Sequence, residues 1–265
     1  MGVIMSAFAI ASTLGVPFSL YLANIFSWHA PFLFVGFLGI IIIPLVTKLV
    51  PAMSEHIQKN KSPRWEVLTE VIKNPTQRMA LLFSALMMMG HFMIIPFINP
   101  YMEFNNGYPK SITPMIYLVG GITSFASANI LGRISDKYGK LPVFSISVLT
   151  SLFFVWIITN LPPIHFGFVL IIFGIWFSLA TGRAVTSQAM ISKVVNLNQR
   201  GSFMSFNSSV QQLGTSFASL IAGLVVMKST DGKITHYSWL GYLSILILIL
   251  CFLIARRLFK NIDLE

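Results

Sequence analysis

Long apolar stretches separated by short charged segments dominate the chain. Lys, Arg, Asp and Glu are absent from residues 1–47, 79–102, 111–132, 141–182, 201–227 and 234–255. A helix crosses a bilayer with about 20 mostly apolar residues, so the two longest stretches each have room for two crossings. Both are interrupted where a turn is needed, at residues 24–31 and at Asn160–Pro163. The pattern therefore predicts eight transmembrane helices.

The predicted helices lie at Met1–Leu22, Pro31–Val50, Met79–Tyr101, Ile112–Gly132, Pro142–Thr159, Phe166–Val194, Gly201–Met227 and Tyr237–Ala255. Apolar and polar residues do not alternate with a period of two in these stretches, which disfavours a transmembrane barrel. The fold class expected is all-α, a polytopic membrane helical bundle. One long polar connection, residues 51–78, follows the second helix. Trp65, Leu68 and Ile72 have helical spacing there and predict a short helix at the membrane interface.

The composition agrees with this pattern. Hydrophobic residues make up 55% of the 265 residues and charged residues 10%, and the mean hydropathy is +0.77. Such values are typical of an integral membrane protein, whose expected partner is the lipid bilayer. The net charge of +10 would suggest nucleic acid as the partner of a soluble protein. Here the cations lie in short segments between apolar stretches, which disfavours nucleic-acid binding.

The distribution of the cations predicts the orientation in the membrane. An even number of crossings places both termini on the same side. Fourteen of the 18 Lys and Arg residues then fall on that side, Lys110, Lys228 and Lys233 fall on the other, and Arg183 lies within a helix. By the positive-inside rule the side with more cations faces the cytoplasm, so both termini are expected there.

A compact charged segment, Gly132–Pro142, joins the fourth and fifth predicted helices. We expect a tight cytoplasmic loop in which Gly132 lets two backbones approach, Gly139 permits the chain to reverse and Pro142 opens the next helix. The Asp136 carboxylate is expected to accept hydrogen bonds from a helix N-terminus, or to pair with the neighbouring cations Arg133 and Lys137.

Three segments resemble the major facilitator superfamily. The spacing Gly132-x-x-x-Asp136-x-x-Gly139-Lys140 is similar to its loop signature. Residues 11–17, with Gly15 and Pro17, resemble the Gly/Pro signature in the fifth helix of antiporters, and Pro17 predicts a kink there. Residues 200–214 resemble the eleventh helix of bacterial efflux permeases of the arabinose-efflux type.

The resemblance implies a twelve-helix fold made of two six-helix halves. The signature loop follows the eighth helix in that fold, so the chain is expected to be a partial major facilitator fold with helices five to twelve. Residues 1–50 are then the last two helices of the N-terminal half, residues 51–78 the cytoplasmic central loop and residues 79–265 the C-terminal half. We expect the coding sequence to continue upstream of Met1 in frame.

The function that the resemblance implies is secondary active transport by alternating access, with proton-coupled efflux of small organic molecules across the bacterial inner membrane and no cofactor. The cytoplasmic gating loop would consist of Gly132, Arg133, Asp136, Lys137, Gly139 and Lys140, with Asp136 close to residues 1–6. An enzyme is disfavoured, because metal-ligand spacing and a Ser–His–acid set are both lacking. A non-transporting interaction or scaffold protein and an inactive fragment stay open as alternatives.

Two ionisable residues lie inside predicted helices. His91 is near the middle of the third helix, where such a group is costly unless it faces a cavity or a partner. It either handles substrate or protons, or is a neutral imidazole bonded to a neighbouring helix. Arg183 is the one permanent charge well inside an apolar stretch. Either its long stem reaches the interface, or it holds an anionic group or closes the inner gate.

Uncharged polar residues give weaker candidates for the substrate path. Gln211 and Gln212 lie at mid-depth in the seventh helix, where hydrogen bonding between helices is the preferred interpretation. Asn99 and Glu103 close the third helix on the outer side, and an exposed helix cap is the preferred interpretation for both.

Overall fold

The computed structural model describes residues 15, 18–23, 25–49, 71, 73–195 and 199–260. Its helices are α2 (Ala30–Leu49), α4 (Pro75–Phe92), the 3₁₀ helix η1 (Ile95–Phe97), α5 (Ile98–Phe104), α6 (Met115–Tyr138), α7 (Lys140–Thr159), α8 (Phe166–Ser192), α9 (Arg200–Val225) and α10 (Tyr237–Phe259). An antiparallel ribbon pairs β1 (Met227–Lys228) with β2 (Ile234–Thr235). The expected all-α membrane bundle is confirmed.

Six segments of the described part are long and apolar enough to cross a membrane, namely α2, the combined span Pro75–Phe104, α6, α7, α8 and α10. Helix α9 has 26 residues and is long enough, but its Ser, Asn and Gln residues make it too polar to join this set. The predicted bounds of α7, α8 and α9 agree with the structure within two residues, and so does the predicted start of α10.

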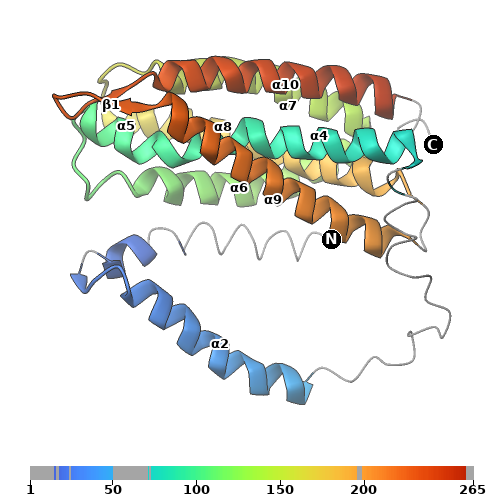
Figure 1. Cartoon of the computed structure of the whole chain (residues 1–265), viewed down its shortest axis with the longest axis horizontal. Coiled ribbons are helices and arrows are strands. Elements are labelled where there is room, and N and C mark those ends of the chain that lie inside the picture. The colour runs from blue at the N-terminus through green and yellow to red at the C-terminus, as the bar shows by residue number, and fades with distance from the viewer. Residues whose placement is uncertain are drawn as a thin grey trace.

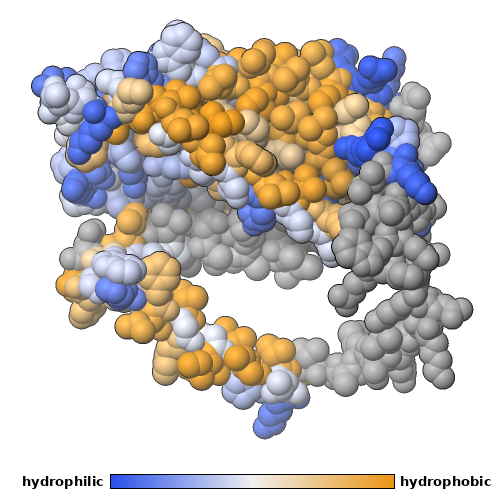
Figure 2. All heavy atoms as spheres, in the orientation of Figure 1, coloured by the Kyte–Doolittle hydropathy of each residue, from blue (hydrophilic) through white to orange (hydrophobic). Residues whose placement is uncertain are grey.

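Helices α4 to α10 form one bundle with an apolar outer surface. Helix α8 packs against α6 and α7, α4 packs against α9 and α10, and α10 also packs against α7 (Figure 1). In the core between them, the rings of Phe144 and Phe259 lie 5.5 and 5.4 Å from that of Phe83. Figure 2 shows hydrophobic residues over the middle of the bundle and hydrophilic residues at its two ends, as expected for helices that cross a bilayer.

Helix α2 lies apart from this bundle in Figure 1, and none of its residues is buried. The first predicted helix is described only at Gly15 and residues 18–23, which are helical. An added Cβ on Gly15 would have no heavy atom within 4 Å, so this glycine makes no close helix contact in the described structure. Pro17 and its predicted kink lie outside the described residues.

The long polar connection is described at Val71 and from Lys73 onward. Val71 is helical and only 4% exposed, whereas the three residues that predict an interfacial helix lie outside the described residues. Helix α4 begins four residues before the predicted start, at Pro75. The reason is a strong cap: the Asn74 side chain accepts from the backbone N–H groups of Thr76 and Gln77, and proline is favourable at the first helical position.

The predicted third helix, Met79–Tyr101, lies in one span, Pro75–Phe104, but the helix is broken between α4 and α5. Pro96 lies in η1 at the break and lacks the N–H that a continuous helix would need there. Two tyrosines from other helices donate to carbonyls at the break, which also accept from the backbone N–H groups of Phe97 and Ile98. The hydroxyl of Tyr237 donates to Ile94 O at 3.2 Å, and that of Tyr117 donates to Ile95 O at 3.3 Å. The break is therefore held from two sides by α10 and α6.

The prediction of a loop at Gly132–Pro142 is wrong. Helix α6 continues to Tyr138 and α7 begins at Lys140, so Gly139 alone connects them, with φ 93°. This positive φ confirms the predicted reversal at Gly139. A Cβ added to Gly132 would meet no described heavy atom within 4 Å, so the expected close approach of two backbones is not found among the described residues. The charged residues misled the prediction, because a helix can leave the bilayer and continue in water for two more turns.

Candidate functional site

Polar side chains recur on the inner faces of α4 and α8. Gln77, Ser84 and His91 follow one another at intervals of seven residues on α4, which is about two helical turns, so they share one face. Trp176 and Arg183 are related in the same way on α8. These two faces meet where the His91 ring lies 5.0 Å from that of Trp176, with an angle of 31° between the planes.

Arg183 is the most unusual of these residues. Its side chain is 1% exposed, so the expectation that its stem reaches the interface is wrong. The guanidinium makes one side-chain hydrogen bond, from Nη1 to Ser151 Oγ on α7 at 3.1 Å, and its buried Nε has no partner. In the described ranges the one ion pair joins Lys140 to Asp136, so no carboxylate neutralises Arg183. A buried cation without a counter-ion costs several kcal/mol.

His91 is half-buried, and its Nδ1 is buried without a hydrogen-bond partner. The alternative of an imidazole bonded to a neighbouring helix is not found among the described residues, where stacking on Trp176 takes its place. The Trp176 indole is fully buried, and its Nε1 also lacks a partner. Arg183 shares the Trp176 face of α8, seven residues further along the helix. His91, Trp176 and Arg183 therefore form one cluster with three unused nitrogen atoms.

Gln211 on α9 forms hydrogen bonds with side chains of two other helices. Its Nε2 donates to Ser84 Oγ on α4 at 2.9 Å and to Gln188 Oε1 on α8 at 3.5 Å. One turn along, a Cβ on Gly214 would stand 2.4 Å from the carbonyl oxygen of Ala85, so α4 and α9 are in backbone contact. These contacts support the packing interpretation for Gln211. Gln212 is exposed on the outer side of α9 and joins neither the cluster nor this contact.

The charged residues after Gly132 lie on the last two turns of α6 and not in a loop. Asp136, with 74% of its side chain exposed, pairs with Lys140 at 3.4 Å, across the Gly139 connection. The expected pairs with Arg133 and Lys137 are not formed in the part that the structure describes. Residues 1–6, the other expected neighbours of Asp136, lie outside the described residues.

Comparison with known proteins agrees with this architecture. A model of the Major Facilitator Superfamily matches residues 1–184 and 80–263. The chain belongs to the major facilitator superfamily. It is also 26% identical over 145 residues to a protein of Escherichia coli (strain K12) named "Putative transporter AraJ". That match covers 54% of the chain and 35% of the relative, so the chain spans about a third of the relative's length. The predicted resemblance to arabinose-efflux-type permeases is confirmed.

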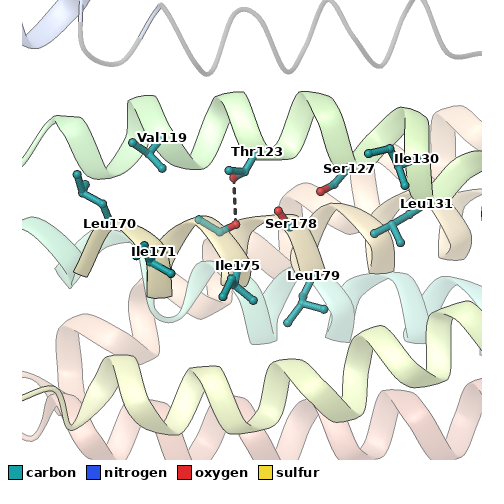
Figure 3. A pocket seen from close by; sticks show the side chains of 11 residues that line it. Val119, Thr123, Ser127, Ile130, Leu131, Leu170, Ile171, Ile175, Ser178 and Leu179 are labelled. Atoms are coloured by element: carbon teal, nitrogen blue, oxygen red, sulfur yellow. Dashed lines mark hydrogen bonds between the residues drawn. The ribbon is translucent and has the colours of Figure 1, made fainter. Parts of the chain in front are cut away.

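A groove of about 530 Å³ runs between α6 and α8 of this major facilitator protein (Figure 3). It is lined by Val119, Thr123, Ser127, Ile130, Leu131, Leu170, Ile171, Gly174, Ile175, Ser178 and Leu179. The Thr123 hydroxyl donates to Gly174 O at 3.0 Å, the contact drawn in Figure 3. Charged residues are absent from the lining, and small side chains let α6 and α8 approach closely. This groove is suited to an apolar neighbour and not to a polar substrate.

The outer end of the broken span differs from the expected exposed cap. Glu103 is half-buried and accepts from the Thr113 hydroxyl at 2.9 Å, while Asn99 Oδ1 is buried without a partner. Asn105 forms two hydrogen bonds of 2.8 Å with the backbone N–H and carbonyl of Ile234 in β2. These contacts fix α5 against the ribbon that precedes α10.

Sequence reasoning missed Trp176 and Ser151, which contact His91 and Arg183, and two further buried polar residues. Asn207 is fully buried on α9, and neither its Oδ1 nor its Nδ2 has a partner. Gln77 is 5% exposed with an unpartnered Oε1. The sequence spacing could have identified both. Asn207 lies four residues before Gln211, and Gln77 lies fourteen before His91, so each shares a helix face with a residue that was a candidate for the substrate path.

Proposed function

We propose that the chain belongs to a secondary active transporter that exports small organic molecules by alternating access, driven by protons. The observation that carries the proposal is the cluster of His91, Trp176 and Arg183, with unused nitrogen atoms inside a bundle of membrane-spanning helices. Ionisable groups at such positions in a membrane are costly and typical of substrate or ion pathways. A protein that only held partners together would not need them.

The family fold supplies the organisation of the proposal. Residues 1–50 belong to the N-terminal half, residues 51–78 to the cytoplasmic central loop and residues 79–265 to the C-terminal half. The two halves rock about a site near the middle of the bilayer and open it to each side in turn. Both termini face the cytoplasm of a bacterial inner membrane, as the excess of cations on that side favours.

His91 is the residue proposed to couple transport to protons. An imidazole exchanges its proton near neutral pH, which a guanidinium does not. A proton on His91 repels the Arg183 cation on α8, so the charge of one residue affects what the other can bind. Release of the proton from His91 is thereby linked to the binding of a ligand at Arg183.

Export by the gene product tests the proposal. The gene is expressed from its natural locus, with its upstream sequence, and metabolites inside and outside the cells are compared with those of a deletion strain. We expect at least one small molecule to leave the cells in a manner that collapses when the proton gradient is dissipated. Equal metabolite profiles in both strains would favour the non-transporting interaction protein.

The role of His91 is tested with His91→Asn against His29→Asn, which changes an exposed histidine before α2. We expect His91→Asn to abolish the dependence of export on the pH gradient and His29→Asn to preserve it. An unaltered pH dependence in His91→Asn contradicts the coupling role.

A further inference from the structure

The cluster around Arg183 contains hydrogen-bond donors without acceptors. The guanidinium and the indole N–H can only donate. Ser151 takes one N–H of Arg183, through Nη1, while Nε and the Nε1 of Trp176 have no partner. Both side chains are at most 1% exposed, and their seven-residue spacing puts them on one face of α8. This face therefore offers two hydrogen-bond donors and a positive charge. No described residue accepts a hydrogen bond from Nε of Arg183 or Nε1 of Trp176, and none forms an ion pair with Arg183.

The counter-charge is not found within the spans of this chain. The eight acidic residues are Glu55, Glu66, Glu70, Glu103, Asp136, Asp231, Asp263 and Glu265. Of these, Glu103 and Asp136 lie in described spans, each in the last turn of its helix. Glu103 is bonded to Thr113 and Asp136 to Lys140. Among the described residues, therefore, none supplies an anion that neutralises Arg183.

The geometry of the guanidinium selects the kind of anion. Ser151 holds it at Nη1, which leaves the edge formed by Nε and Nη2 without a bond to any described residue. Such an edge presents two parallel N–H groups, which match the two oxygens of a carboxylate or of a phosphate. Placed at this edge, an oxyanion removes the cost of the buried cation.

We infer that the molecule carried by this protein is an organic anion, whose carboxylate or phosphate group binds Arg183. The inference rests on the proposed transport function and narrows its substrate class. Trp176 lies on the same face of α8, about two helical turns from Arg183, and its ring and that of His91 are suited to an apolar or aromatic part of the same molecule. Ser151 acts as a positioning residue that fixes the plane of the guanidinium.

Binding to the purified chain in nanodiscs tests the inference without transport. The probes are benzoate with its neutral analogue benzamide, glucose 6-phosphate with glucose, and inorganic phosphate alone. Thermal shift and calorimetry are measured for the unaltered chain, Arg183→Gln, Arg183→Lys and the matched control Arg257→Gln, in which the exchanged arginine is exposed. The two organic pairs distinguish a carboxylate site from a phosphate site.

We expect at least one anion, and not its neutral analogue, to raise the melting temperature. Arg183→Gln should weaken that binding at least tenfold, Arg183→Lys should weaken it less, and Arg257→Gln should leave it unchanged. Without ligand, Arg183→Gln should melt at the same temperature as the unaltered chain or higher, because an uncompensated buried charge has been removed.

Three outcomes overturn the inference. They are equal binding of the neutral and charged analogues, no stabilisation by any of the anions, and a lower melting temperature of ligand-free Arg183→Gln, which would make Arg183 a structural residue. Export of neutral compounds alone by the gene product also overturns it and leaves the transport function intact. Anion binding without any export contradicts the transport function, and with it the claim that the anion is carried, but leaves an anion-binding site at Arg183.

Discussion

The imidazole of His91 stacks on the indole of Trp176, with ring centroids 5.0 Å apart, and so joins the end of α4 to the middle of α8. The contact brings together residues 85 positions apart in the sequence. It also lies beside the break in the span at Met93–Phe97, where α4 gives way to η1. A change at Trp176 therefore affects both the candidate site and the packing of the two helices.

Trp176→Ala is expected to lower the free energy of unfolding by about 3–5 kcal/mol, because it empties a fully buried indole site. Thermal or denaturant unfolding in detergent measures the change. Trp239→Ala is the matched control, since Trp239 is 59% exposed on α10 and should lose far less. A similar loss at both positions would mean that the described core is not what stabilises the bundle.

Gly214→Ala is expected to separate α9 from α4, because the new methyl would stand 2.4 Å from the Ala85 carbonyl oxygen. A backbone atom cannot yield as a flexible side chain does, so the cost should be about 1–3 kcal/mol. Gly223→Ala on the same helix meets nothing within 4 Å. It should be neutral, or stabilising by up to about 1 kcal/mol through helix propensity. Melting temperatures that fall equally for both variants contradict the close contact.

Tyr237→Phe is expected to destabilise the broken span, because it removes one of the two hydrogen bonds that the Ile94 carbonyl accepts, the other coming from the Phe97 N–H. Loss of one hydrogen bond from a carbonyl that keeps a second donor costs about 0.5–1.5 kcal/mol. Tyr242→Phe, at a position 46% exposed on the same helix, is the comparison. Hydrogen exchange at residues 93–98 gives a local measure, and unchanged protection there would remove the role assigned to the tyrosine.

Asp136→Asn is expected to change stability by less than about 1 kcal/mol, because its ion pair with Lys140 is exposed. If the residue gates the cytoplasmic side as proposed, export by the gene product should nevertheless fall. Measuring export and melting temperature on the same preparation separates the two effects. Normal export by the folded variant would contradict the gating role.

Much of the helical architecture could be predicted from the sequence. Apolar stretches without charges placed α7 and α8 within two residues, since the bilayer imposes both length and composition on a crossing helix. The two differences between prediction and structure, at Met93–Phe97 and at Gly132–Tyr138, arose where this rule does not apply. A proline can break a helix while the apolar stretch continues, and a helix can continue after the apolar stretch has ended.

The candidate site was predictable only in part. His91 and Arg183 stand out in the sequence because ionisable side chains are rare in a span. They are rare because such a group is costly inside a membrane, whichever way its side chain points. Whether Arg183 reaches the interface or turns inward depends on which face of α8 meets α6 and α7, and no local pattern encodes this.

The sequence by itself determined that the chain crosses a membrane as helices, and it marked the residues that are costly there. Only the tertiary structure decided that Arg183 is buried beside Ser151 without a carboxylate, that His91 rests on Trp176 and that Gly214 touches Ala85. Crossing depends on the average polarity of a stretch of chain, whereas each of these contacts depends on how two distant helices are rotated and packed against each other.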